Sequence, residues 1–507
     1  MSGGLLIALA LLIPLAGAGL IALSGRWPNL RETVMIITAV LLFAVNLLLA
    51  IEFIGGETPA LRVLEPVEGV PIAFAIEPLG MLFGLVASFL WIVTSFYSIG
   101  YMRANGEARQ TRFYACFALA LGATMAVAFS GNLLTTFIGY EALTLTTYPL
   151  VTHHGDAKSV RAGRTYLGIL LGTSIALLLP GIVATWMLAG TLDFRAGGIL
   201  SGTTSDGVVL LLLGLYMFGI GKAALMPIHR WLPAAMVAPT PVSALLHAVA
   251  VVKAGVFVAL KVIVYVFGID LLNSSGAGAL LVWIATITLV VASVVALTKD
   301  NLKARLAYST VSQLAYVVLA GALATQWGIL GGGMHIAMHA FGKITLFFCA
   351  GAIYTALHKT EVSEMGGIGR AMPVTMLAFL VGALSVAGLP PGGGTWSKWY
   401  IALAAAETGH LVIVGALMLS TLLNIAYFMP IVARAWFAPR ARHPGHPARS
   451  AGAMAAPDGG EGLKEAPLFC LIPLSLTALG CIVLFVFAGE LQAFLAPMID
   501  GLSTKGR

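Results

Sequence analysis

The sequence is poor in charge and in cysteine. Only 10% of its 507 residues are charged and 59% are hydrophobic, a balance that excludes a water-soluble globular protein and indicates a membrane protein. The basic residues lie in short loops between apolar runs, so the net charge of +7 does not indicate nucleic-acid binding. The four cysteines are scattered without the spacing of a metal or redox site, and we expect them to pack between helices.

The sequence also lacks the motifs of energy-converting sites. It contains no phosphate-binding loop, no dinucleotide-binding glycine fingerprint, no cluster of cysteine ligands and no histidine pair with haem spacing. We therefore predict no cofactor, no metal and no catalytic or redox site in this chain. Any transport must draw on an ion gradient or on partner subunits.

Long apolar runs dominate what is present. A helix needs about 20 residues to cross the hydrocarbon core of a bilayer. No basic residue precedes the first run, which we therefore expect to be a retained span and not a cleaved signal. Fourteen spans are predicted, at residues 5–23, 33–54, 79–101, 113–130, 132–152, 165–189, 207–226, 241–267, 277–298, 306–324, 329–357, 373–404, 409–436 and 467–489.

The charges of the loops predict an orientation. Of the lysines and arginines assigned to loops, nearly all follow odd-numbered spans, whereas loops after even-numbered spans hold only Arg62 and Arg195. Because cytoplasmic loops carry the excess of basic residues, the odd-numbered loops are predicted to face the cytoplasm. Both termini are then on the outer (periplasmic) side of the cell (inner) membrane.

Two spans are predicted to be broken by proline and glycine. Pro227 comes directly after the seventh span, and Pro390 and Pro391 lie among glycines inside the twelfth. At membrane depth such irregular backbone is tolerated only inside protein or beside a wet cavity. The breaks are five spans apart, and an odd offset turns the second copy upside down. We therefore predict an all-α integral membrane fold of about 14 helices with two inverted five-helix repeats, spans 4–8 and 9–13, with broken helices 7 and 12.

This organisation divides the chain into five segments. The first three helices occupy 1–110, the first repeat 111–270 and the inverted second repeat 271–437. Residues 438–466, rich in Pro, Gly, Ala, Arg and His, are predicted to be a flexible cytoplasmic linker, and 467–507 holds the last helix.

Four charged residues lie deep inside predicted spans: Glu141, Lys222, Lys253 and Lys398. A charge at such depth costs at least ~2.5–3.5 kcal/mol and usually lines an ion or proton path. Glu141 is the only acidic residue placed at mid-span, and Lys222 is its expected partner, so that the pair would control the proton affinity of the lysine. The alternatives are a static buried pair, a static counter-ion at Lys253 and a Lys398 that snorkels to the interface.

A histidine stripe runs along the eleventh span. Spacings of four place His335, His339 and Lys343 on one helical face. Two histidines so spaced can bind a metal, but no carboxylate accompanies them, and a hydrated proton path suits imidazole better. Additional candidates for the relay are His247, Lys261, Lys343 and His229. The alternative for His247 is a structural hydrogen bond, and for Lys261 it is snorkelling to the interface.

Several segments resemble a known family. Residues 140–144, 221–233, 238–255 and 304–313, with the histidines of the eleventh span, resemble the antiporter-like membrane subunits of respiratory complex I and of Mrp-type sodium/proton antiporters. The resemblance covers nearly the whole chain. It implies the fourteen-helix inverted-repeat fold and a central polar axis. The resemblance implies that Glu141 and Lys222 are a coupling pair and that Lys253 is a bridging lysine. It also implies that His335 and His339 are connecting groups and that Lys398 is the terminal site.

Within the family, Tyr140-Glu141-Ala-Leu-Thr and the Thr-Tyr-Pro-Leu-Val that follows look most similar to the D-type large subunit of Mrp-type antiporters. We expect a proton-translocating subunit of such a cation/proton antiporter, with other membrane subunits as partners and with Na⁺ or K⁺ passing through them. One alternative is the same module in a complex I-like NADH:quinone oxidoreductase or a membrane-bound hydrogenase. The other is an inert structural membrane subunit.

Overall fold

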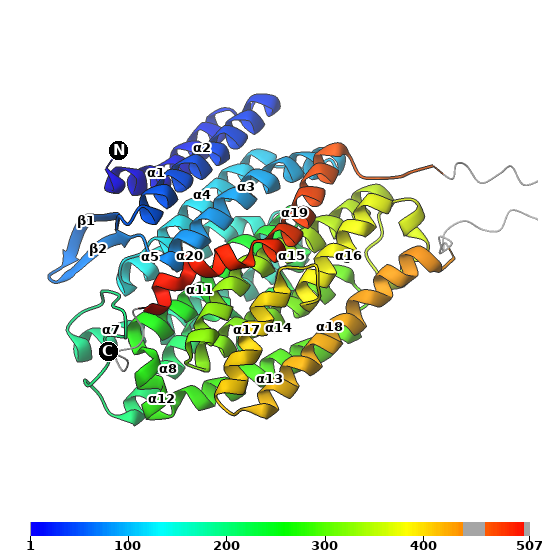
Figure 1. The fold of residues 1–507 in the computed structure, drawn as a ribbon. Coiled ribbons are helices and arrows are strands. Elements are labelled where there is room, and N and C mark those ends of the chain that lie inside the picture. The colour runs from blue at the N-terminus through cyan, green and yellow to red at the C-terminus, as the bar shows by residue number, and fades with distance from the viewer. Residues whose placement is uncertain (1, 440–461, 501–507) are drawn as a thin grey trace, which may run out of the picture.

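The computed structural model describes residues 2–439 and 462–500, which form one bundle of roughly parallel helices (Figure 1). The predicted linker 438–466 falls mostly outside the described residues, as does 501–507. The first half of the chain contains these helices: α1 (Gly3–Leu23), α2 (Pro28–Ile54), α3 (Pro78–Ala104), α4 (Gln110–Ala128), α5 (Leu133–Val151), α6 (Ala157–Thr173), α7 (Leu179–Ala189), α8 (Asp206–Gly219), α9 (Trp231–Ala234), α10 (Thr240–Ala244) and α11 (Val251–Val262).

The second half continues the bundle. Its helices are α12 (Ile269–Ser275), α13 (Ala277–Thr298), α14 (Leu302–Ala322), α15 (Gln326–Leu357), α16 (Pro373–Ala387), α17 (Gly394–Glu407), α18 (Leu411–Phe437), α19 (Leu468–Val486) and α20 (Ala488–Asp500). Short π-helical and 3₁₀ segments join them: η1 (Ser174–Leu178), η2 (Gly221–Ala223), η3 (Ile228–Arg230), η4 (Ala235–Val237), η5 (Leu245–Val249), η6 (Ile263–Phe267), η7 (Val362–Glu364) and η8 (Ile368–Arg370).

The helices match the predicted spans closely. In the described part of the chain, 10 continuous helical segments are long and apolar enough to cross a membrane. The other predicted spans correspond to α5 and α14, which carry many polar residues, and to the interrupted helices around α8 and α16–α17. The all-α membrane architecture is confirmed. One addition is α20, which follows α19 after a bend and packs against α3 and α15 (Figure 1).

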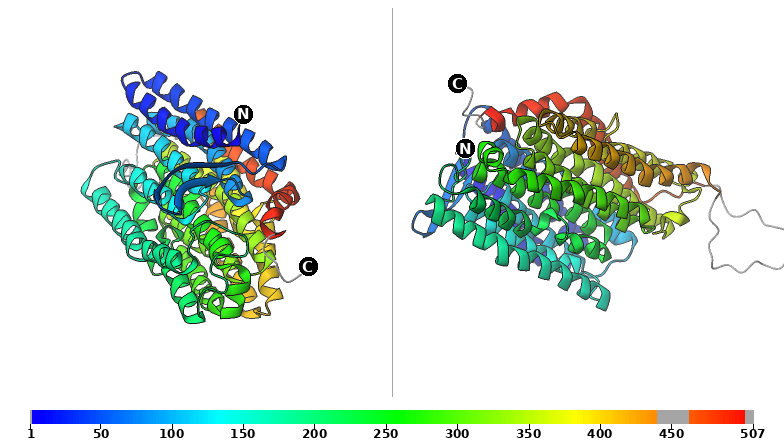
Figure 2. Two further views of the ribbon diagram at one scale, coloured as in Figure 1. Left: turned by 90° about the vertical axis from the view of Figure 1, so that its left-hand side faces the viewer. Right: turned by 90° about the horizontal axis from the view of Figure 1, so that it is seen from below.

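The bundle has two distinct ends. At the hairpin end, strands β1 (Ala60–Val67) and β2 (Val70–Ala75) pair antiparallel around a turn at Gly69, whose φ of +77° favours glycine. The sequence analysis did not predict this hairpin, because it is short and lies between spans. The opposite end, here called the basic end, carries the loops 24–27, 105–109, 152–156, 299–301 and 358–372. α1 begins and α20 ends at the hairpin end (Figures 1 and 2).

The charged helices lie inside the bundle. In the segment 240–267, which contains α11, 100% of the most apolar stretch is buried, and in α15 the share is 94%, whereas it is 33% in α18 and in α19. The outer helices therefore present apolar faces to lipid. The charged and histidine side chains of α11 and α15 face protein, which removes the largest cost of placing them at membrane depth.

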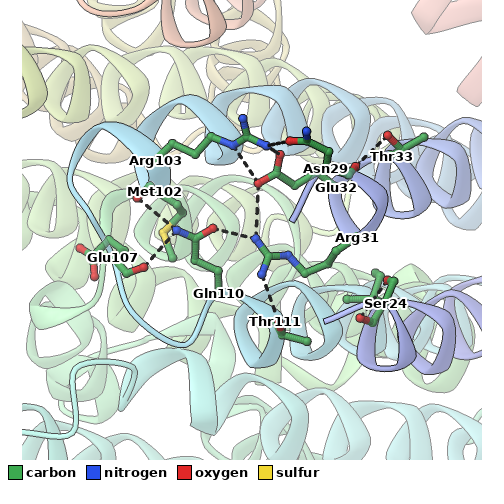
Figure 3. Close-up of polar contacts among 11 residues, drawn as sticks. Ser24, Asn29, Arg31, Glu32, Thr33, Met102, Arg103, Glu107, Gln110 and Thr111 are labelled. Atoms are coloured by element: carbon green, nitrogen blue, oxygen red, sulfur yellow. Dashed lines mark hydrogen bonds and ion pairs between the residues drawn. The ribbon is translucent and has the colours of Figure 1, made fainter. Parts of the chain in front are cut away.

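A polar network fastens the outermost helices at the basic end (Figure 3). Arg31 of α2 donates hydrogen bonds to Gln110 (2.8 Å) and Thr111 (3.1 Å) at the start of α4. Arg103 of α3 forms an ion pair with the buried Glu32 of α2. Two arginines thus share one carboxylate, which ties α2 to α3 and α4 without leaving that carboxylate unpaired.

Gly255 of α11 sets how closely this helix approaches the interrupted segment after α8. A Cβ atom at this position would collide with the backbone of Lys222 and Ala223. The side-chain-free surface therefore lets α11 pack directly on η2.

We expect Gly255→Ala to lower the free energy of unfolding by about 1–3 kcal/mol, the usual cost of overpacking a rigid contact. The measurement is the thermal unfolding midpoint of the purified protein in detergent. Gly168→Ala on α6 is the matched control, because a Cβ there meets nothing within 4 Å. Equal midpoints for the two variants would contradict this account of the contact.

Candidate functional site

Lys222 is the best-defined member of the site. It lies in η2, just after α8 ends, and its side chain is fully buried. Its Nζ donates to the carbonyl oxygen of Tyr140 (2.8 Å) and to the hydroxyl of Thr144, and it lies 3.1 Å from the centre of the Tyr140 ring. The Tyr140 hydroxyl in turn accepts the backbone N–H of Lys222 at 3.0 Å. Sequence reasoning did not assign these two roles, although both residues flank Glu141 on α5.

Glu141 lies beside this contact without forming it. In the described residues it has no ion pair with Lys222, and neither of its buried carboxylate oxygens has a hydrogen-bond partner. Lys222 is nevertheless close enough to interact with it electrostatically. The arrangement places the carboxylate as a nearby charge, while neutral oxygens hold the ammonium directly.

The next members lie on α11 and α15. Lys253 Nζ is in hydrogen-bond contact with Nδ1 of His339. The His339 and His335 rings stack, with centroids 5.7 Å apart, as their spacing of four predicts. Nδ1 of His335 lies 2.9 Å from the hydroxyl of Ser397 on α17. The row thus passes from one half of the chain to the other through three direct contacts.

Lys398 occupies the second helix break. Its Nζ donates to the carbonyl oxygens of Val386 (2.9 Å) and Ala387 (3.0 Å), the last residues of α16, and so sits at the negative end of that helix. Gly388, with φ +85°, leaves room for it, since a Cβ there would lie 2.6 Å from the Lys398 side chain. The Tyr316 ring centre is 4.5 Å from Nζ and also stacks on His335.

The other predicted candidates lie beside this row or away from it. Lys343 is one turn beyond His339 and donates to the Leu306 carbonyl (3.0 Å). His247 is fully buried in η5, and neither of its ring nitrogens has a partner among the described residues. Lys261 lies at the hairpin end in an ion pair with Glu77. His229 is at the basic end, with its ring centroid 6.1 Å from that of Tyr308.

A cavity of about 360 Å³ opens at the basic end near the start of α10. Glu107 and His154 of its lining form an ion pair at 3.4 Å. Burial alone would raise the pKa of Glu107, but the hydrogen bond and charge of His154 outweigh it and hold that pKa below its usual value. The same hydrogen bond raises the pKa of His154. Both groups therefore stay charged between these two pKa values, and the pair is lost as the pH rises through that of His154.

Behind this cavity a polar face leads inwards. Thr240 lines the cavity, and Ser243 and His247 follow on the same helical face. The Ser243 hydroxyl and the His247 ring are buried without hydrogen-bond partners in the described part of the chain. Ser95 and Ser98 of the neighbouring α3 share this condition. Buried polar atoms without protein partners normally bind ordered water.

Comparisons with known proteins identify the family of the chain. The family described as "NADH:quinone oxidoreductase/Mrp antiporter, TM" matches residues 130–424, more than half of the chain. The chain therefore belongs to this family of multi-pass, antiporter-like membrane proteins.

The relatives come from several complexes. NADH-quinone oxidoreductase subunit N of Desulforudis audaxviator is 32% identical over 82% of this chain and 82% of the relative. Subunit L of Mycobacterium tuberculosis is 29% identical over 96% of this chain and 76% of the relative. Hydrogenase-4 component B of Escherichia coli is 32% identical, but the match covers only 68% of this chain and 53% of the relative.

Two solved structures share the fold over nearly the whole length. One is a chain of the Mrp complex from Dietzia sp., with a TM-score of 0.85, 20% identity and coverage of 99% of this chain and 98% of that one. The other belongs to an archaeal membrane-bound sulfane sulfur reductase, with a TM-score of 0.82, 23% identity and coverage of 98% and 97%. At such identities the likeness concerns the fold.

Proposed function

We propose that this chain is the proton-translocating subunit of a multi-subunit cation/proton antiporter of the Mrp type, in the position of the D-type large subunit. The observation that carries the proposal is the row of buried titratable side chains. It begins with Glu141 and Lys222, continues through Lys253 and the two histidines, and ends at Lys398. Such a row costs free energy in a protein that only needs to be folded, and this cost disfavours an inert structural role.

The contacts from Lys253 through the two histidines to Ser397 support movement of a proton along this part of the row. Lysine and histidine side chains can each hold or release one proton, and Ser397 can accept one while donating another. The Nε2 atoms of His335 and His339 are buried without partners among the described residues, which supports water molecules between the members. Water next to imidazole provides the continuous hydrogen bonds that proton transfer needs.

The proposed switch is the distance between Glu141 and Lys222. When the carboxylate approaches, its charge stabilises the protonated lysine. When it withdraws, the ammonium keeps only neutral oxygens and gives up its proton more readily, towards Lys253. The proton that reaches Lys253 adds a positive charge to the row. This charge repels the proton on Lys398, the terminal site, which releases it towards the hairpin end, the outer side of the membrane. In this scheme the polar face from the basic-end cavity to His247 supplies protons, and the basic end faces the cytoplasm.

The energy source lies with partners in this proposal. Other membrane subunits would pass Na⁺ or K⁺, because this chain offers one mid-membrane carboxylate and a bare cation prefers several oxygen ligands. The relatives named subunit N, subunit L and hydrogenase-4 component B favour a second candidate, the same module in a quinone-reducing or hydrogenase complex. Identification of the proteins that co-purify with this chain separates the two, since only the second candidate requires partners with iron–sulfur centres.

We expect Glu141→Ala to abolish coupled transport while the complex still assembles, because Glu141 forms no ion pair or hydrogen bond in the described structure. The measurement is proton flux in liposomes containing the purified complex, with assembly checked by gel filtration. Glu57→Ala, at an exposed position just after α2, is the control. Wild-type flux in Glu141→Ala would rule out the switch.

We expect Lys253→Ala to block transfer between the two halves and Lys253→Arg to remain inactive. Arginine keeps the positive charge but does not release a proton in a protein. The same flux assay reads out both variants. An active Lys253→Arg would identify the residue as a static counter-ion.

We expect Lys398→Ala to stop net transport, and Lys398→Glu to retain part of it because a carboxyl group can also exchange protons. Assembly should persist in both, since the partners that the described structure gives the Lys398 ammonium are backbone carbonyls and an aromatic ring. Normal transport by Lys398→Ala would exclude a role as the terminal site.

A further inference from the structure

A second polar row leaves Lys398 in a different direction. Along α14, polar residues recur every three or four positions on one face and so form a stripe towards the basic end. α13 and α18 pack against this stripe with polar residues of their own. The members of this side row are all buried: Arg305, Ser309, Ser312, Gln313 and Tyr316 of α14, Ser293 of α13, and Ser420, Asn424 and Tyr427 of α18.

The inner part of the side row consists of hydroxyl groups. Ser293 Oγ lies 2.8 Å from Ser312 Oγ and 3.1 Å from Ser420 Oγ. The Tyr316 hydroxyl donates to the carbonyl of Leu417, about one turn before Ser420 on α18. The ring of the same tyrosine faces Lys398. Hydroxyl groups donate and accept at one atom, so this part of the row could carry a proton away from Lys398.

The outer part of the side row has different chemistry. Gln313 Nε2 donates to Asn424 Oδ1 at 3.3 Å, and the Asn424 amide donates to the Ser420 carbonyl at 2.6 Å. The Tyr427 hydroxyl is within hydrogen-bond distance of both Asn424 Oδ1 and Ser309 Oγ, so hydroxyl groups are present again beyond the amide pair. An amide has its donor and acceptor on different atoms and does not exchange a proton near neutral pH. The amide pair therefore interrupts the chain of hydroxyl groups.

Arg305 closes the row at the basic end. Its Nη1 donates to the Tyr427 carbonyl (2.9 Å) and its Nε to the Lys299 carbonyl (2.8 Å), which holds the guanidinium across the end of the row. Only 9% of the residue is exposed. A guanidinium remains charged, and a fixed positive charge in a narrow passage repels hydrated protons.

We propose that Arg305 and the Gln313–Asn424 amide pair form a barrier that prevents protons from leaking between Lys398 and the basic end. The proposal rests on the proposed function, in which Lys398 exchanges its proton with the hairpin end. A terminal site that opened to both ends would dissipate the gradient. The polar residues around α14 would provide such an opening if their outer part could relay protons.

A purely structural cluster and a barrier predict opposite results. Substitutions in a structural cluster lower stability and leave passive proton permeability unchanged. Substitutions in a barrier raise permeability, a gain that loss of folding does not produce. Arg305→Met removes the charge at similar length, and Asn424→Asp replaces an amide by a group that can hold a proton.

The experiment uses the full chain with its co-purifying subunits in liposomes. An inward gradient of the permeant anion thiocyanate, in a choline buffer free of sodium and potassium, makes the interior negative and drives protons inwards without a coupled cation, and a pH-sensitive dye reports the flux. We expect wild-type liposomes to match protein-free ones. Each substitution should raise the flux about tenfold, the factor that corresponds to about 1.4 kcal/mol of lost barrier. The leak should disappear when Lys398→Ala is added.

The chain offers matched controls. Asn46→Asp introduces a carboxyl group at another fully buried asparagine, in α2 and far from the side row, and Arg370→Met removes an exposed arginine at the basic end. Both should leave the flux unchanged. Gln313→Glu repeats the test within the amide pair if either primary variant fails to assemble.

Three results would overturn the barrier: no leak in assembled Arg305→Met, Asn424→Asp and Gln313→Glu, an equal leak in Asn46→Asp, or a leak that persists with Lys398→Ala. A different result would contradict the proposed function: coupled transport that persists when Lys398→Ala is introduced into the otherwise wild-type complex. Absence of a leak together with Lys398-dependent coupled transport contradicts the barrier alone.

Discussion

Placing ammonium groups at membrane depth is the constraint on which the rest of this structure depends. A buried charge needs polar partners that replace water, and a carboxylate is the strongest choice. Three interior lysines use neutral oxygens instead: Lys222 the carbonyl of Tyr140, Lys343 that of Leu306, and Lys398 those of Val386 and Ala387. Lys253 contacts the imidazole of His339. Lys261, at the hairpin end, has a carboxylate partner in Glu77. Neutral partners stabilise an ammonium without fixing it, which suits groups proposed to exchange protons, whereas an ion pair suits a fastening role.

The interrupted helices follow from the same constraint. An unbroken helix uses its own carbonyl groups internally, and only its last turn leaves them free. The break after α16 creates such an end inside the bundle, and Gly388 gives Lys398 access to it. The break after α8 places Lys222 in a short 3₁₀ turn, where Gly255 of α11 packs on its backbone. The two breaks therefore position charge as well as ending helices.

Much of the fold and part of the site could be predicted from the sequence. Hydropathy located the spans, Pro390 and Pro391 located the second break, and spacing of four placed His335 and His339 on one face. The first break was predicted too late, at Pro227, because α8 already ends at Gly219, before Lys222. The partners of Lys222 and Lys398 were not predictable, because a backbone carbonyl leaves no sequence signal. The side row was missed for a related reason. A serine in a helix usually bonds to its own preceding turn, so Ser312 and Ser420 look ordinary until α13, α14 and α18 come together.

The two polar rows that meet near Lys398 differ in whether their side chains can exchange protons. Along the central row the side chains are Glu, Lys, His and Ser, each of which can take up a proton and release it again. Along the side row this property is interrupted at Gln313 and Asn424, and Arg305 adds a charge that is never lost at the basic end. Directional transport requires both properties at a terminal site, a conducting contact on one side and an insulating one on the other. In the proposed mechanism, the direction of proton release therefore depends on which polar residues surround α14. Hydropathy does not distinguish these residues, because it scores serine and asparagine alike as interruptions of an apolar run.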